Sequence, residues 1–296
     1  MTHRMGITAL TLAAWAALAA APQVRAQGMG AQQQGTQQQG TQQQGTQEQR
    51  PSLQNPTPQK PAAPVVDPKE EAAYKAFVAM KPTAPADYDA QIQAGEDFVK
   101  NYPQSHYLVV VYSRLTNAYF ERQKLDKMYV AADKTLQLNP NDVTVLTLVG
   151  WVIPRGNPTS PGFADQLAKA EQYEKHALEI LATLPKPAEL TDEQFATTKA
   201  SAVSQAHSGL GLVYFREGKD SDSVAELTKA TEGNPQPDPT DYFVLGVEDE
   251  KLSKFADAQK SFEGCAQITS QLQDRCKQGV AEAKAKAGSQ PQPPKP

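Results

Sequence analysis

Small and large apolar residues recur at helical spacing through most of this chain, in segments that each end in a break. The clearest segment runs from Ala206 to Pro235, where Leu210, Gly211 and Tyr214 share one face of a predicted helix. A second predicted helix, after a break at Gly218, carries Ser223, Leu227 and Ala230. This spacing predicts two antiparallel helices in which small residues let the backbones approach and large residues fill the space between them.

The segment resembles the tetratricopeptide repeat (TPR), a 34-residue helix pair whose pattern is bulky, Leu-Gly, Tyr, then Ala, Phe, Ala and Pro. Two further segments follow the pattern: one through Tyr112, Leu115, Tyr119, Met128, Ala132 and Thr135, the other through Tyr242, Leu245, Gly246, Ala258, Phe262 and Cys265. The resemblance implies an all-α fold, a right-handed α-solenoid of antiparallel helix pairs with about four to five TPR-like units and a C-terminal capping helix.

One repeat, residues 143–184, departs from the family pattern. Its first helix is predicted to end at Pro154, and a loop with two prolines and two glycines (155–162) precedes a second helix that resumes at Phe163. Binding and catalytic residues are often found on loops of this kind, although a tolerated insertion without a function is the simpler interpretation. In the last repeat, Asp249 stands where the family has an aromatic residue.

Capping residues predict where several helices begin. Asp67 is a predicted N-cap with Pro68 at the first helical position. Residues 191–194 (Thr-Asp-Glu-Gln) match a capping box that opens a helix reaching about Glu217, longer than a TPR helix needs. Its first half is expected to pack on the preceding pair. A helix over 270–286, apolar on one side and charged on the other, is predicted to cap the solenoid.

The first 26 residues match a secretory signal peptide, with a cationic start, an apolar run from Ile7 to Ala21 and small residues around a cleavage site after Ala26. An uncleaved membrane anchor is the alternative, but the apolar run is about 15 residues long and a bilayer span needs ~20. No later segment is apolar enough to span a membrane. We therefore expect an exported protein, periplasmic or secreted, without an integral membrane segment after cleavage.

The predicted organisation is a signal peptide (1–26), a disordered leader (27–66), a helical repeat domain (67–287) and a disordered Pro-rich tail (288–296). The leader is rich in Gln, Gly and Thr and then in Pro, so it has little to bury and ordering entropy dominates. It is interpreted either as a tether or as a passive low-complexity leader. The turn Tyr-Pro-Gln-Ser at 102–105 resembles turns in cell-envelope TPR proteins of Gram-negative bacteria.

The charge balance disfavours nucleic acid as a partner. The sequence has 29 Lys and Arg against 33 Asp and Glu, a net charge of −4. Removal of the signal peptide takes away Arg4 and Arg25 and no acid, which leaves 27 − 33 = −6. Because phosphate binding needs clustered Lys and Arg, we expect a protein or peptide partner.

The sequence predicts no catalytic residues, no cofactor and no metal site. It contains no Gly-x-Ser-x-Gly turn, no phosphate-binding loop and no His-Glu-x-x-His, and Gly209-Leu210-Gly211 lies inside a predicted helix without a preceding strand. His106, His176 and His207 fall on different predicted elements. The acidic run Glu248-Asp249-Glu250 is interpreted as a solvated helix face.

Cys265 and Cys276 are the two cysteines of the chain. By the TPR register, Cys265 faces the following helix, and Cys276 lies on that helix. One disulfide in an oxidising compartment requires such a pair, so we predict a disulfide that clamps the capping helix. Two buried free thiols are the alternative.

In TPR proteins the first helices of the repeats line a concave surface. The resemblance, transferred position by position, predicts a peptide-binding groove of Val110, Ser113, Asn117, Phe120, Trp151, Leu212, Phe215, Phe243 and Val247. Family members that grip a C-terminal carboxylate have Lys and Arg at several of these positions, and this sequence does not. The predicted groove is apolar and aromatic, suited to a peptide with hydrophobic anchors. Alternatively, some of these side chains pack against the long helix and the 155–162 loop.

Together these features favour a non-catalytic scaffold for protein–protein interactions in the cell envelope. One alternative is a structural accessory of outer-membrane or cell-wall assembly, tethered by its leader. The other is an enzyme with catalytic residues gathered from distant helices, which the absence of a nucleophile–base pattern disfavours.

Overall fold

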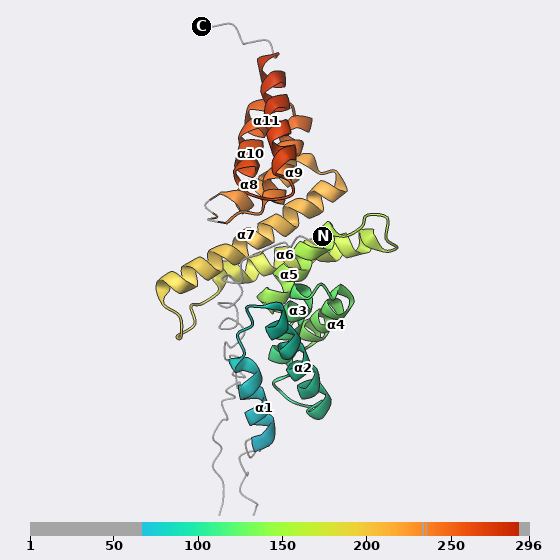
Figure 1. The fold of residues 1–296 in the computed structure, drawn as a ribbon, viewed down its shortest axis with the longest axis vertical. Helices are drawn as coiled ribbons and strands as arrows, with labels where there is room; N and C mark the ends of the chain where they lie inside the picture. The colour runs from blue at the N-terminus through green and yellow to red at the C-terminus, as the bar shows by residue number, and fades with distance from the viewer. Residues whose placement is uncertain (1–66, 233, 235, 290–296) are drawn as a thin grey trace, which may run out of the picture.

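The computed structural model describes residues 67–232, 234 and 236–289. The predicted signal peptide (1–26), the leader (27–66) and the tail beyond residue 289 lie outside the described residues. Within the described ranges the chain forms eleven α-helices and one short 3₁₀ helix, with no strand. Figure 1 shows the helices stacked from α1 at one end to α11 at the other, which is an all-α solenoid.

Consecutive helices pack as neighbours along the stack. Their bounds are α1 Pro68–Ala79, α2 Pro85–Asn101, α3 Leu108–Glu121, α4 Leu125–Leu138, α5 Val143–Val152, α6 Phe163–Thr183, α7 Asp192–Glu217, α8 Asp220–Thr231, α9 Pro239–Lys251, α10 Phe255–Gln267 and α11 Gln273–Gly288. The 3₁₀ helix, η2 (Ile153–Arg155), directly follows α5. No described helix combines the length and the apolar character that a membrane span requires.

Two helix starts are capped as the sequence predicts. The Asp67 carboxylate accepts a hydrogen bond from the backbone N–H of Lys69 at 2.9 Å and so caps α1. Thr191 and Gln194 exchange the two hydrogen bonds of a capping box at the start of α7. These caps satisfy backbone N–H groups that have no partner within the helix.

The capping helix begins later than the predicted residue 270. The Ser270 hydroxyl accepts a hydrogen bond from the backbone N–H of Leu272 at 3.2 Å, and this local turn precedes the first helical residue, Gln273. The short polar side chain thus competes with the helix for its own backbone. The helix extends to Gly288 and packs along α10 and against α9.

Large side chains seated against glycines hold neighbouring helices together. A Cβ atom added to Gly246 on α9 or to Gly279 on α11 would lie 2.7 Å from a ring atom of Phe262. Real Cβ contacts do not reach such a distance, so both positions require glycine. The Phe262 ring, 3% exposed, therefore fills a notch that two glycines on neighbouring helices form.

The two longest helices, α6 and α7, lie across the middle of the stack (Figure 1). Ala202 in the first half of α7 shares a buried cluster with Leu181 of α6 and Val143 of α5. The second half of α7 pairs with α8, where Leu227 packs against Gly211. This division of the long helix between two neighbours confirms the sequence prediction.

The interpretation of residues 248–250 as a solvated face is wrong. Glu248 is fully buried and Asp249 is 3% exposed. The reason is the position of α9, which is packed against α8 on one side and α10 and α11 on another. Burial raises the pKa of Asp249 to about 6. Glu248 forms an ion pair with Lys251, although burial still raises the pKa of its carboxyl group.

A disulfide joins Cys265 of α10 to Cys276 of α11 in this structure, with the two Cα atoms 5.7 Å apart. Both residues are fully buried. The bond closes a short loop that contains the turn between the two helices, so it ties the capping helix to the last repeat.

We predict that the Cys265→Ser/Cys276→Ser variant unfolds with a free energy about 3 kcal/mol lower than that of the wild type, because the cross-link restricts the unfolded chain. Urea unfolding followed by circular dichroism measures this difference. Alkylation of the unreduced, unfolded chain is the companion test: two reactive thiols would contradict the disulfide.

Candidate functional site

The predicted groove residues all lie on the first helices of the helix pairs. They are Val110, Ser113, Asn117 and Phe120 on α3, Trp151 on α5, Leu212 and Phe215 on α7, and Phe243 and Val247 on α9. These four helices contact one another in chain order. Ser113 and Leu212 are buried, whereas the other seven are partly exposed. Those seven are the residues from which a binding face could be built.

The structure brings two aromatic residues of this face into contact and places the other two against one buried cluster. The Phe120 and Trp151 rings meet edge to face, with centroids 6.0 Å apart. Phe215 and Phe243 pack against one buried cluster, formed by Leu212, Leu227, Val244 and Leu245. Leu212 thus contributes to the core beneath Phe215 and Phe243 and not to the surface above it.

Cationic side chains cover three of these four rings, a feature that the sequence does not predict. The Arg155 guanidinium lies 3.6 Å from the centre of the Trp151 ring. Lys251 lies 5.2 Å from the Phe215 ring, and Arg275 lies 4.9 Å from the Phe243 ring. Only the contact between Arg155 and Trp151 could be expected from the sequence, since these residues are four positions apart at a helix end. The Lys251–Phe215 and Arg275–Phe243 contacts each join two different helices.

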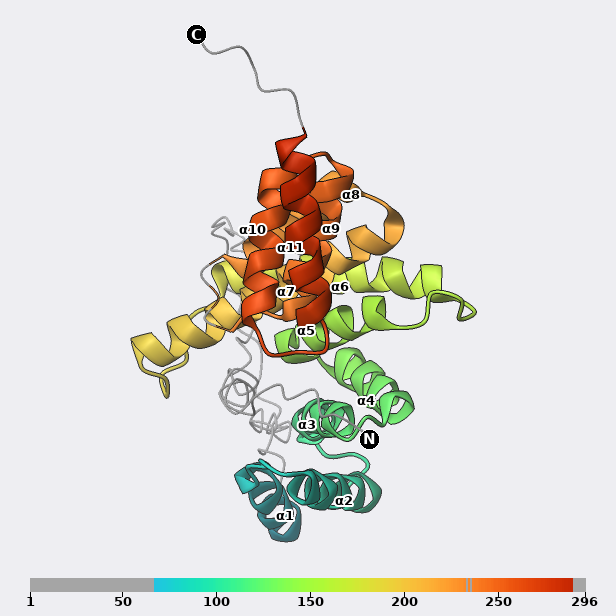
Figure 2. The same ribbon diagram turned by 45° about the horizontal axis from the view of Figure 1, so that its top comes forward.

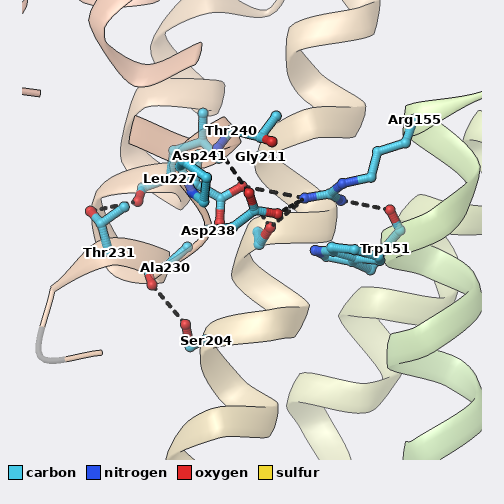
Figure 3. A network of polar contacts seen from close by, with 12 residues as sticks. Trp151, Arg155, Ser204, Gly211, Leu227, Ala230, Thr231, Asp238, Thr240 and Asp241 are labelled. Carbon is cyan, nitrogen blue, oxygen red and sulfur yellow. Dashed lines mark hydrogen bonds and ion pairs between the residues drawn. The ribbon is translucent and has the colours of Figure 1, made fainter. Parts of the chain in front are cut away.

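Arg155 is the centre of a polar network that links α5, α7 and α9 (Figure 3). Its guanidinium donates hydrogen bonds to the Trp151 carbonyl and to the Asp238 carboxylate, both at 2.7 Å. Asp241 lies 3.6 Å away and accepts a hydrogen bond from the Ser208 hydroxyl at 2.7 Å. Figure 3 shows the Trp151 ring beneath the guanidinium, so the Arg155 side chain both stacks on Trp151 and pairs with Asp238.

Pro154 explains why Arg155 reaches these partners. Proline cannot donate the helical hydrogen bond, and α5 gives way to the 3₁₀ turn Ile153–Arg155. The carbonyl of Pro154 accepts a hydrogen bond from Nε of Arg216 on α7 at 2.8 Å. The break that departs from the TPR pattern therefore directs Arg155 toward the later helices.

The Asp241 residue is only 3% exposed. Burial, helped by the nearby Asp238 carboxylate, raises its pKa to about 7, while Arg155 and the Ser208 hydroxyl oppose the shift. Asp238 is also the N-cap of α9, with a 2.8 Å hydrogen bond from Thr240 N–H. One guanidinium thus stabilises two acids at the start of the last repeat.

Glu174 lies at the crossing of α5, α6 and α7, fully buried and without a hydrogen-bond partner among the described residues. A Cβ atom added to Gly150 or Gly209 would fall within 2.5 Å of its Oε1 atom. Its side chain therefore fills a two-glycine notch, as Phe262 does near the C-terminus. Burial raises the pKa of Glu174 well above its usual value, and the charge of Arg155 opposes this.

The face offers aromatic rings and charged hydrogen-bonding groups. His207 pairs with Glu226 of α8 at 2.6 Å, apart from the Arg155 network. The described residues contain no group of three or more His, Cys, Asp or Glu side chains that could hold a metal ion. The arrangement is chemically suited to non-covalent recognition of apolar and charged side chains.

No protein-family model and no curated protein matches the chain. Among solved structures, it is similar to PilW, a widely conserved type IV pilus biogenesis factor, with a TM-score of 0.51 and 15% identity over 75% of this chain and 89% of that one. TTC0263, a TPR protein of Thermus thermophilus, aligns with a TM-score of 0.45 and 15% identity over 73% of this chain and 99% of that one. The likeness to PilW concerns the fold alone, an all-α helical-repeat fold.

We predict that Glu174→Leu raises the free energy of unfolding by about 1–4 kcal/mol, because an apolar side chain replaces a buried carboxyl group that lacks partners. Leu227 shows that leucine fits against a glycine at a comparable crossing. A raised carboxyl pKa means that the folded state keeps a proton the unfolded state has lost, so stability falls as pH rises from about 4. The gain should therefore be larger at pH 8 than at pH 5 in urea titrations. The exposed Glu193→Leu is the control, and an equal gain there would contradict the account.

We predict that Arg155→Met lowers the free energy of unfolding by about 2–4 kcal/mol, because it leaves two mostly buried carboxyl groups without their cation. Methionine keeps an apolar stem over Trp151. Arg122→Met is the matched control: Arg122 pairs with Asp89 at the surface (2.9 Å, Asp89 side chain 46% exposed), so its loss should lower the stability far less. Equal losses in the two variants would show that the Arg155 network has no special role.

Proposed function

We propose that this chain is a non-catalytic scaffold that binds a peptide or protein partner in the cell envelope, along the face of its first helices. The helical-repeat fold fits a protein-interaction scaffold. The residues of the face come from α3, α5, α7 and α9, so a partner that binds there contacts successive repeats and not a single loop.

The observation that carries the proposal is the set of four partly exposed aromatic side chains on this face. The Phe120 and Trp151 rings meet edge to face, and Phe215 and Phe243 pack on one shared buried cluster. Aromatic rings at the centre of an interface supply much of its binding energy. Because rigid helices already hold these rings, little conformational entropy is lost when a partner docks.

The envelope location is supported by the sequence. The first 26 residues match a secretory signal, and the two cysteines are suited to an oxidising compartment. PilW, described as a type IV pilus biogenesis factor, supports the fold alone at 15% identity. A role in assembling an envelope structure therefore rests on the signal peptide and the interaction face together.

We predict that Phe120→Ala/Phe215→Ala removes most of the proteins captured by the wild-type chain from an envelope extract of its host, because it deletes two of the four aromatic anchors. Affinity capture with quantitative mass spectrometry measures the loss. Val130→Ala/Leu138→Ala is the matched control, since these exposed apolar side chains lie on α4, a second helix (63% and 52% exposed). It should leave the captured set unchanged.

The thermal unfolding of each variant is compared first, so that loss of fold is not mistaken for loss of binding. A captured set that is identical for the wild type and the folded Phe120→Ala/Phe215→Ala variant contradicts binding at this face.

A further inference from the structure

Two arginines at the C-terminal end of the candidate face have no acidic partner among the described residues. Arg216, near the end of α7, lies 5.8 Å from the centre of the Phe215 ring, and Arg275, near the start of α11, lies 4.9 Å from the Phe243 ring. Both are exposed. The other described arginines are engaged: Arg122 and Arg155 in ion pairs, and Arg114 with the carbonyls of Val78 and Met80.

Several acidic side chains on α7, α8 and α9 pair with lysines. The pairs are Glu217–Lys219, Glu250–Lys286, and Asp220 and Glu248 with Lys251. Arg216 uses only its Nε atom, in the hydrogen bond to the Pro154 carbonyl. Its two terminal nitrogens have no partner among the described residues and remain available to a ligand.

The apolar part of the patch consists of the rings that these two cations lie over. Phe215 and Phe243 are partly exposed and pack on the same buried cluster, and Val247 is partly exposed one turn further along α9. Figure 2 shows α11, which carries Arg275, beside α9. Each guanidinium lies over a ring, and the planar fork of a guanidinium matches a carboxylate with two hydrogen bonds.

We propose that the arginine–phenylalanine patch (Arg216, Phe215, Phe243 and Arg275) binds an acidic internal segment of the partner protein, in which Asp or Glu side chains alternate with apolar ones. The inference rests on the proposed scaffold function and names the chemistry of its partner. The apolar side chains contact the two phenylalanines, and the carboxylates pair with the two arginines. At physiological salt, charges beyond about 8 Å are screened, so the net charge of −4 does not prevent these direct contacts.

The test uses the full chain and a fluorescein-labelled, amidated peptide of three Glu-Phe-Glu units, with a Lys-Phe-Lys peptide as its counterpart. Amidation removes the terminal carboxylate, so binding reports the side chains alone. Fluorescence anisotropy at about 0.15 M salt should give at least about tenfold tighter binding of the Glu peptide, because charge-assisted bonds form only with it. Arg216→Ala/Arg275→Ala should weaken that binding by about tenfold or more.

Lys134→Ala/Lys169→Ala is the matched control, since it removes the same charge from exposed positions on α4 and α6. It should leave the affinity for the Glu peptide unchanged. Arg216→Glu/Arg275→Glu should reverse the preference toward the Lys peptide, a gain that unfolding cannot imitate.

Failure of the Glu peptide to bind the wild-type chain, or equal affinities in the wild type and Arg216→Ala/Arg275→Ala, would overturn the inference. The capture experiment distinguishes this inference from the proposed function. If Phe120→Ala/Phe215→Ala abolishes protein capture while Arg216→Ala/Arg275→Ala leaves it unchanged, the scaffold function is supported and the prediction of an acidic partner is wrong.

Discussion

Close packing of neighbouring helices depends on large side chains that fit between small residues. Near the C-terminus the side chain is Phe262, seated against glycines of α9 and α11, and in the middle of the solenoid it is Glu174, seated against glycines of α5 and α7. Burial of an aromatic ring stabilises the folded state, whereas burial of a carboxyl group without hydrogen-bond partners destabilises it through lost hydration. The same geometry therefore stabilises one crossing and makes the other sensitive to pH.

Arg155 compensates for part of that electrostatic cost and also shapes the candidate face. Its positive charge opposes the pKa shifts of Glu174 and Asp241. The same guanidinium stacks on Trp151 and pairs with the N-cap of α9. The core and the surface are thus connected, because the residue that holds the helices together also fixes an aromatic ring on the face.

The sequence predicts what depends on local spacing: the helices, the caps at Asp67 and Thr191, and the break at Pro154. It does not reveal the role of Glu174, because the insertion after Pro154 obscures the register of the helix that carries it. The Arg155–Asp238 pair escapes it because those residues are 83 positions apart. Burial of residues 248–249 follows from helices on either side of α9, which no local pattern reveals. The groove residues lie on the predicted helices. The cationic side chains of Lys251 and Arg275, which lie over the Phe215 and Phe243 rings, belong to other helices than those rings and could not be predicted.

Oxidative footprinting of the full chain, with and without a captured partner, tests most directly whether the first helices form the binding face. The account predicts that the partner protects Phe120, Trp151, Phe215 and Phe243 from oxidation, while the exposed Leu125, Val130 and Leu138 of α4 stay reactive. Unchanged oxidation of the four aromatic residues, with protection of the α4 residues, would contradict it.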